Sequence, residues 1–204
     1  MPPDNSHHLV LASASPARRA LLTAAGIDAD VLVSGVDESV VEADDAYTLS
    51  LSLARMKARA VAARLPAEPG VLVLGCDSVL AFDGEVLGKP ADAAEAVKRW
   101  QAMRGRSGVL HTGHHLTELV SGRQAEDVGA TVVHFADVTD EEIDAYVATG
   151  EPLQVAGAFT IDGRGGAFVE RIEGDSGNVI GLSLPLLRRL LGELGLSITD
   201  FWRD

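Results

Sequence analysis

The sequence predicts an α/β fold in which helices flank a mixed sheet. Short apolar runs at residues 9–12 and 71–74 are typical of strands buried on both faces, although periodicity alone does not separate them from buried helix. Helical and strand patterns alternate over the first half of the chain, and segments typical of antiparallel hairpins follow. Because alternation favours parallel strands and hairpins require antiparallel ones, we expect the sheet to contain both.

Composition limits the classes of partner and compartment. Of the 204 residues, 47% are hydrophobic and 23% charged, as expected for a soluble globular protein. We expect residues 1–204 to form a single domain, with a flexible tail over residues 1–8. The net charge of −13 argues against nucleic-acid polymers and anionic membranes as partners. The chain has no signal-peptide pattern or membrane-span pattern, and its single cysteine, Cys76, is compatible with a reducing compartment, so we expect a cytoplasmic location.

The first predicted strand, residues 9–12, runs through a serine-rich loop into a helix. Ser15 is a suitable N-cap, Pro16 suits the first helical position, and Gly26 is a natural stop. The free N–H groups at such a helix start can bind an anion. The first turn of a helix usually favours acidic side chains, but here it carries Arg18. A basic residue at this position fits an anion site. The alternative, a capped surface helix with solvated arginines, is equally compatible with the sequence.

Two further elements precede the centre of the chain. Residues 30–33 are expected to form a short strand, followed by an acidic loop over residues 35–38. Residues 47–65 are rich in helix formers and carry apolar side chains at helical spacing. Lys57 lies in this helix, and from the pattern alone a surface lysine is the better interpretation.

The stretch over residues 71–90 is the centre of the predicted architecture. A buried strand begins at residue 71, and Gly75 suggests that it reaches the surface there, which places Asp77 at the end of a central strand. Asp83-Gly84 predicts a hairpin turn, and the returning segment ends at Lys89. A carboxylate with a lysine beside it fits phosphate and metal chemistry. A turn-forming Asp77 and a solvated Lys89 are the simpler interpretation of this segment alone.

The remaining elements complete the sheet and its helices. We expect helices at residues 91–103, 139–149 and 184–194, and strands at residues 109–120, 128–135 and 167–172. The second of these helices has a capping-box pattern that begins at Thr139. Three histidines, His111, His114 and His115, fall in one strand. They could bind a metal, but ordinary strand histidines are the stronger interpretation.

Together these pieces resemble the Maf family of nucleoside triphosphate pyrophosphatases. The matching segments are LASASPARRALL at 11–22, VDE at 36–38, LARMKA at 53–58, GCDSVL at 75–80, GKP at 88–90, HTG at 111–113, YVATGEP at 146–152, AGAF at 156–159 and NVIGL at 178–182. The resemblance implies a long twisted mixed sheet, two lobes around a cleft, and hydrolysis of a nucleoside triphosphate to monophosphate and pyrophosphate. It also implies a divalent metal cation, Mg²⁺ or Mn²⁺, and leaves a homodimer open.

The resemblance also assigns roles to individual residues. Ser13, Ser15 and Arg18 match a phosphate-binding loop, and Lys57 and Lys89 match lysines that contact phosphate. Glu38 matches an acidic site residue, and Asp77 matches the proposed general base. This assignment is chemically coherent, because hydrolysis at the α-phosphorus brings water to dense negative charge that cations and N–H groups must offset. Glu38 and Asp77 could also bind the metal, so Asp77 is either a base or a ligand.

Departures from the family pattern affect the expected choice of base. Ala17, Ser78 and Asp162 stand where relatives acting on dTTP and UTP carry arginine, threonine and glutamine. Ala17 lacks a bidentate donor, and Asp162 is an acceptor where glutamine both donates and accepts. The run SPARRALL is similar to the branch that hydrolyses 7-methyl-GTP. We therefore expect dTTP and UTP not to be the best substrates, unless Asp162 simply faces solvent.

Two other functions remain open at this point. One is a nucleotide-binding regulator of septation or cell division with little turnover, since the family is linked with inhibition of septum formation. The other is a small-molecule phosphatase on a similar fold. Retention of Asp77, Glu38, Lys57 and Lys89 favours the enzyme.

Overall fold

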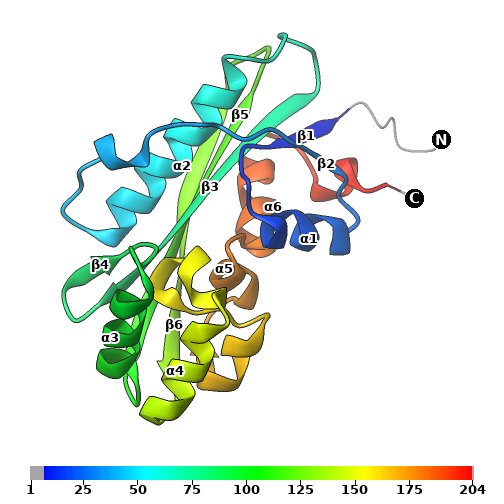
Figure 1. Cartoon of the computed structure of the whole chain (residues 1–204). Helices are drawn as coiled ribbons and strands as arrows, with labels where there is room; N and C mark the ends of the chain where they lie inside the picture. The colour runs from blue at the N-terminus through cyan, green and yellow to red at the C-terminus, as the bar shows by residue number, and fades with distance from the viewer. Residues whose placement is uncertain (1–6, 204) are drawn as a thin grey trace.

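The computed structural model describes residues 7–203, in which seven strands form one sheet (Figure 1). The strands are β1 (His8–Leu11), β2 (Ala29–Val31), β3 (Val71–Phe82), β4 (Glu85–Leu87), β5 (Ser107–Glu118), β6 (Gln124–Phe135) and β7 (Val169–Glu173). The α-helices are α1 (Pro16–Ala24), α2 (Ala46–Ala62), α3 (Ala93–Met103), α4 (Asp140–Ala148), α5 (Ser176–Ile180) and α6 (Leu184–Glu193). Helices flank the sheet, as predicted.

The sheet is mixed, which confirms the predicted fold class. Its strand order is β2-β1-β3-β5-β6-β7, and β4 pairs with β3 alone. β1 runs parallel to both β2 and β3, whereas β3, β5, β6 and β7 form antiparallel pairs. Parallel pairing therefore comes from the alternating first half of the chain, and antiparallel pairing comes from the later hairpins.

Strand β3 corrects the expectation that the central strand ends near Gly75. It continues to Phe82, so Asp77 lies in the middle of a long strand and not at its end. β5 pairs with β3 from Leu72 to Ala81, which is all of β3 except its two end residues. Gly75 has a packing role instead, because a Cβ placed there would lie 2.1 Å from the carbonyl oxygen of Ala54 in α2. The glycine lets this helix approach the sheet, and it does not end the strand.

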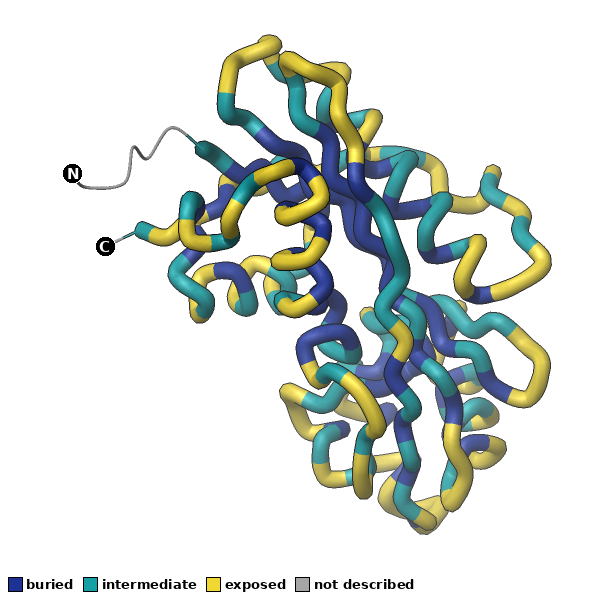
Figure 2. Tube along the Cα trace, turned by 180° about the vertical axis from the view of Figure 1, so that it is seen from behind, coloured by how far each residue is buried: buried dark blue, intermediate teal, exposed yellow. Residues whose placement is uncertain are grey.

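The described residues form three hydrophobic cores. One, which includes Val10, Val61 and Val73, packs α2 against the sheet. The other two lie along the long strands (Figure 2). One contains Leu72, Leu74 and Cys76 of β3 with leucines of α6. The other contains Leu80 and Phe82 of β3 with aromatic residues of the α3 and α4 region. These two cores correspond to the two expected lobes, and Asp77 and Ser78 lie between them on β3. The cleft itself remains a prediction.

The chain ends and the final helices differ from expectation in detail. The predicted tail over residues 1–8 is wrong at His8, which belongs to β1, and residues 1–6 lie outside the described part. The short helix α5 is an addition to the three helices expected after residue 90, and Asp175 is its N-cap. Across residues 7–203, we find no helix with both the length and the apolar character that crossing a membrane requires.

Candidate active site

The loop between β1 and α1 has the predicted serine-capped geometry. Ser15 is the N-cap of α1, and its hydroxyl accepts a hydrogen bond from the Arg18 N–H at 3.4 Å. Ser13 is buried, and its hydroxyl accepts one from the Ser15 N–H at 3.2 Å. Pro16 occupies the first turn, where its missing N–H costs nothing. The two hydroxyls thereby fix the start of the helix.

The Arg18 guanidinium connects this loop to the sheet and to α5. Its Nε donates to the Gly181 carbonyl at 2.7 Å, and its two terminal nitrogens donate to Ser13 Oγ at 3.0 Å and Ser78 Oγ at 3.1 Å. A guanidinium has five N–H donors, so these three contacts leave two for a ligand. Arg18 can therefore brace the loop and still bind an anion.

The hydroxyl of Ser78 continues this network across the sheet. Ser78 Oγ lies 2.9 Å from Thr112 Oγ1 on β5, and Thr112 donates to the Asn178 carbonyl of α5 at 2.8 Å. Sequence reasoning missed Thr112 and Gly181 as parts of the site. The segments HTG and NVIGL, which contain them, were the available signal, but no role followed from either segment alone.

On the opposite face of β3, Lys57 brings the two predicted acidic residues together. Asp77 and Ser78 are consecutive in a strand, so their side chains point to opposite faces. The Lys57 ammonium contacts Asp77 directly and lies 2.8 Å from Oε1 of Glu38. Only 10% of the side-chain surface of either Lys57 or Asp77 is exposed, whereas Glu38 is 54% exposed. The interpretation of Lys57 as a surface lysine is therefore wrong.

The two faces meet at an interruption in strand pairing beside β3. β1 pairs with β3 as far as Leu74, and β4 begins to pair at Leu80. Between these positions neither strand covers this edge, so a ligand there could reach groups on both faces. The predicted residues on one face are Asp77, Glu38 and Lys57, and those on the other are Ser13, Arg18 and Ser78.

The environment of Asp77 affects its acidity. Burial raises the pKa of this carboxyl above its usual value, and the positive charges of Lys57 and Arg18 oppose that rise. A carboxyl with a higher pKa accepts a proton more readily at neutral pH. The site can thus offer a proton acceptor beside cationic groups.

Three predicted site residues are not members of these clusters of polar contacts. Lys89 and Asp162 are exposed, and Ala17 is half-buried. Among residues 7–203, we find no hydrogen bond or ion pair that joins Lys89 or Asp162 to the clusters. For Asp162, this fits the alternative that its carboxylate faces solvent.

Two of the three strand histidines, His114 and His115, have structural partners, whereas Nδ1 of His111 is buried without a hydrogen-bond partner. His114 is buried; its Nδ1 donates to the Thr112 carbonyl at 2.9 Å, and its Nε2 accepts from the Ser183 N–H at 2.9 Å. Burial lowers its pKa to about 4, so the ring is neutral at pH 7. His115 contacts Glu126 and Thr117. In the described part of the chain, no cluster of three or more His, Cys, Asp or Glu residues could hold a metal ion.

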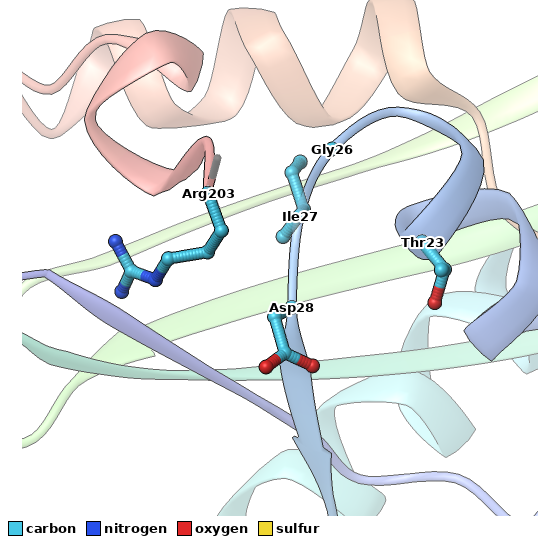
Figure 3. A pocket seen from close by; sticks show the side chains of 5 residues that line it. All are labelled: Thr23, Gly26, Ile27, Asp28 and Arg203. Atoms are coloured by element: carbon cyan, nitrogen blue, oxygen red, sulfur yellow. The ribbon is translucent and has the colours of Figure 1, made fainter.

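Two surface depressions lie elsewhere on the molecule. One, of about 270 Å³, is lined by Thr23, Gly26, Ile27, Asp28 and Arg203 (Figure 3). The other, of about 330 Å³, is lined by Glu142, Ala145, Tyr146, Thr149, Arg164 and Phe168. Neither lining includes a residue that the sequence assigned to the site.

Comparisons with known proteins agree with this arrangement. The family model described as Maf-like protein matches residues 8–194. A nucleoside triphosphate pyrophosphatase of Salinispora tropica is 68% identical over 196 residues, which cover 95% of this chain and 87% of that protein. Proteins with the same name from Streptomyces coelicolor and Microcystis aeruginosa are 59% and 54% identical, and the matches cover 99% and 95% of this chain and 98% of each relative. Because the match spans nearly the whole chain, this protein belongs to the Maf-like protein family.

Proposed function

We propose that this protein hydrolyses nucleoside triphosphates to nucleoside monophosphates and pyrophosphate. The observation that carries the proposal is the contact of one buried ammonium, that of Lys57, with both Asp77 and Glu38. This cluster lies at the interruption in strand pairing, across β3 from the capped start of α1 and Arg18. Relatives named nucleoside triphosphate pyrophosphatase are 53–68% identical over most of the chain, which supports the same activity here.

The cationic groups of the site and the Asp77 carboxylate can have different roles in the reaction. The two remaining Arg18 donors, the N–H groups at the start of α1 and the Lys57 ammonium can offset phosphate charge as the α-phosphorus is attacked. Asp77 can accept the proton of the attacking water, and its raised pKa suits that role. Lys89 is exposed and would have to approach the polyphosphate from solvent.

A divalent metal cation, Mg²⁺ or Mn²⁺, fits the acidic residues that are present. Asp77 and Glu38 both contact the Lys57 ammonium, so the two carboxylates lie close together, and an ion held by both would lie beside that ammonium. Mg²⁺ commonly uses one or two carboxylates and completes its shell with water and substrate phosphates. When bound, such an ion would supply charge stabilisation at the phosphates. Asp77 would then serve as ligand, base or both.

Product analysis tests the proposal. The protein is incubated with a panel of nucleoside triphosphates and either Mg²⁺ or Mn²⁺, and the products are resolved. Monophosphate together with pyrophosphate is the expected result. Stepwise release of orthophosphate would support a phosphatase, and binding without turnover would support a regulatory role in septation or cell division.

Cellular location and assembly remain separate predictions. Cytoplasmic location can be checked by fractionation of cells that express the protein. Sedimentation with and without nucleotide distinguishes a monomer from the homodimer that the family resemblance leaves open.

A further inference from the structure

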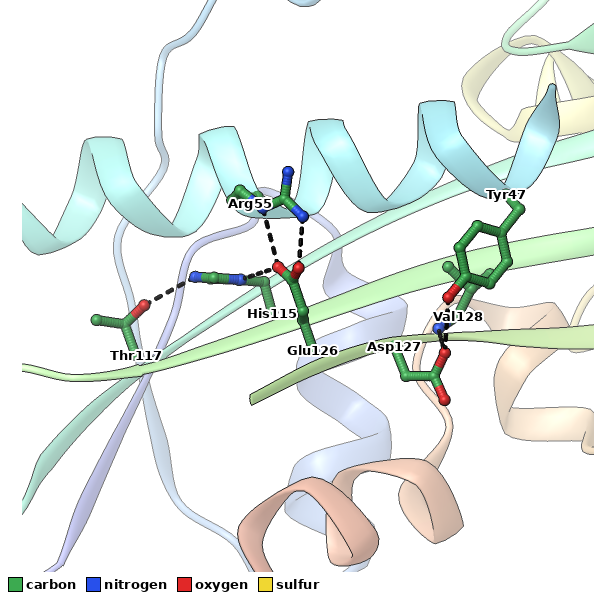
Figure 4. A network of polar contacts seen from close by, with 7 residues as sticks. All are labelled: Tyr47, Arg55, His115, Thr117, Glu126, Asp127 and Val128. Carbon is green, nitrogen blue, oxygen red and sulfur yellow. Dashed lines mark hydrogen bonds and ion pairs between the residues drawn. The ribbon is translucent and has the colours of Figure 1, made fainter. Parts of the chain in front are cut away.

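The helix that carries Lys57 is joined to the sheet by an ion pair two residues earlier. Arg55 of α2 donates from Nε to Glu126 Oε2 at 2.9 Å, and a terminal nitrogen of Arg55 contacts Oε1 of the same carboxylate (Figure 4). This forked contact restricts direction as well as distance. Glu126 lies on β6, so the pair spans β5 and connects α2 with a strand two places from β3.

Glu126 is itself held by a buried side chain. His115 of β5 donates from Nδ1 to Glu126 Oε2 at 2.7 Å, and its Nε2 lies 2.9 Å from Thr117 Oγ1. The His115 side chain has no exposed surface, whereas about a third of Arg55 and of Glu126 is exposed. The carboxylate therefore presents a fixed acceptor to α2. We call Arg55, Glu126 and His115 the α2 clamp.

At two positions α2 approaches the sheet closely without side-chain interlocking. A Cβ at Gly75 would lie 2.1 Å from the Ala54 carbonyl oxygen, and one at Gly113 would lie 2.3 Å from the Ser50 carbonyl oxygen. The helix thus rests on strand positions that have no side chain. Helices usually gain a fixed position from side-chain ridges that enter grooves. Such ridges are missing at these two contacts, so polar contacts can add to the register that Ala58 and Val61 give α2 by packing in the core.

We propose that Arg55 and Glu126 are positioning residues that hold α2 in the register at which Lys57 reaches Asp77. Lys57 follows Arg55 by two residues, and Asp77 lies directly opposite Gly113 on β5. A shift or rotation of α2 over the smooth glycine contacts would separate the Lys57 ammonium from Asp77. If the ion pair were purely structural, its loss would lower the free energy of unfolding without changing the surroundings of Lys57 in the folded molecule.

Lysine acylation followed by mass spectrometry tests this geometry without relying on catalysis. The sequence contains three lysines, and Lys89 and Lys98 are exposed internal references. We expect Glu126→Gln to raise acylation of Lys57 about tenfold relative to both references, because the loss of a charge-assisted contact frees the helix. Glu118→Gln is the control, since its partner Arg123 lies on the turn of the same hairpin and not on α2.

Equal Lys57 acylation in Glu126→Gln and Glu118→Gln, with both variants folded by circular dichroism, would overturn the proposal. If Glu126→Gln does not fold, Arg55→Gln is used with the same readout, because it removes the forked contact without adding a lysine.

Steady-state kinetics provide a second test of the positioning role, and this test rests on the proposed function. Glu126→Gln should lower kcat in a wild-type background and have no further effect in Lys57→Ala, because the clamp acts through Lys57. Independent, multiplicative effects of the two substitutions would also overturn the proposal. Absence of turnover in the wild-type protein would contradict the proposed function, and the acylation result would still decide the positioning role.

Discussion

The Lys57 ammonium joins two carboxylates from different parts of the chain, Asp77 on β3 and Glu38 in the 3₁₀ turn Glu38–Val40 before α2. Asp77 is buried and Glu38 is mostly exposed, so the two groups occupy different environments around one cation. Burial favours the neutral form of Asp77, and the lysine charge opposes it. This arrangement ties the acid–base behaviour of Asp77 to the presence of Lys57.

Asp77→Asn should abolish turnover while the fold and much of the nucleotide binding remain. The substitution is nearly isosteric but removes the proton acceptor and a negatively charged metal ligand. Loss of a general base typically lowers kcat by about 10²–10⁴-fold. Pyrophosphate release measures the rate, and circular dichroism with nucleotide titration checks the fold and binding. A kcat within about threefold of wild type would falsify the assignment of Asp77 as base or ligand.

Lys57→Ala and Lys89→Ala should each raise KM or lower kcat without unfolding the protein. We expect the larger loss, on the order of 10²-fold in kcat/KM, for Lys57, because it also fixes the surroundings of Asp77. Lys89 is exposed, so its removal should act mainly through KM. Steady-state kinetics and circular dichroism are measured on the same samples. Loss of folded structure with normal activity per folded molecule would contradict the assignment for that lysine.

Local signals in the sequence predicted many of the elements correctly. Ser15 and Pro16 begin α1 as expected, and Thr139 forms the predicted capping box of α4. The Asp83-Gly84 turn also forms, with φ of 54° and 83° at its two residues. Each of these features depends on a few neighbouring residues, so a short segment is enough to specify it.

Features that depend on distant partners could not be predicted in the same way. Gly75 looked like a strand end because its close contact with Ala54 is invisible in the sequence. Lys57 looked solvated because its partner Asp77 is 20 residues away. Thr112 contacts Ser78 and Asn178 only because the fold brings β3, β5 and α5 together. The family resemblance grouped the site residues, whereas spacing alone favoured simpler interpretations for Lys57, Asp77 and Lys89.

The stability of the protein should fall between pH 6.5 and 4 because of His114. Its pKa is lowered from 6.5 to about 4 in the fold, so the unfolded chain binds the extra proton first as pH falls. Neutral His114 contributes about 3 kcal/mol to the free energy of unfolding. This contribution is fully present above pH 6.5 and is lost as the pH falls through the pKa of about 4 that His114 has in the folded protein. Urea unfolding at several pH values measures it.

A variant and a control isolate the histidine. His114→Gln should reduce the slope of unfolding free energy against pH over that interval. Val120→Ala, at an exposed position with no titratable side chain, should keep the wild-type slope. An unchanged slope in His114→Gln would assign the acid sensitivity to other groups.

The choice of base gives the last prediction. Ala17 lacks the donor of an arginine, and Asp162 offers acceptors only, which favours a base edge with N–H groups such as that of guanine or 7-methylguanine. The Ser78 hydroxyl is engaged with Arg18 and Thr112, so Ser78→Thr should keep the substrate order. An unpaired buried polar group costs about 1–3 kcal/mol, enough for roughly a 5- to 150-fold preference.

We therefore expect kcat/KM for dTTP and UTP to be lower than that for at least one guanine nucleotide. The measurement compares these substrates at one fixed concentration of Mg²⁺. A higher kcat/KM for dTTP or UTP than for every guanine nucleotide would end the hypothesis. Asp162→Gln tests whether Asp162 causes the base preference. The substitution should leave the fold intact, because Asp162 is exposed in a bend. If this variant keeps the wild-type substrate order, Asp162 faces solvent during catalysis, and the preference must come from Ala17 or from other groups near β3.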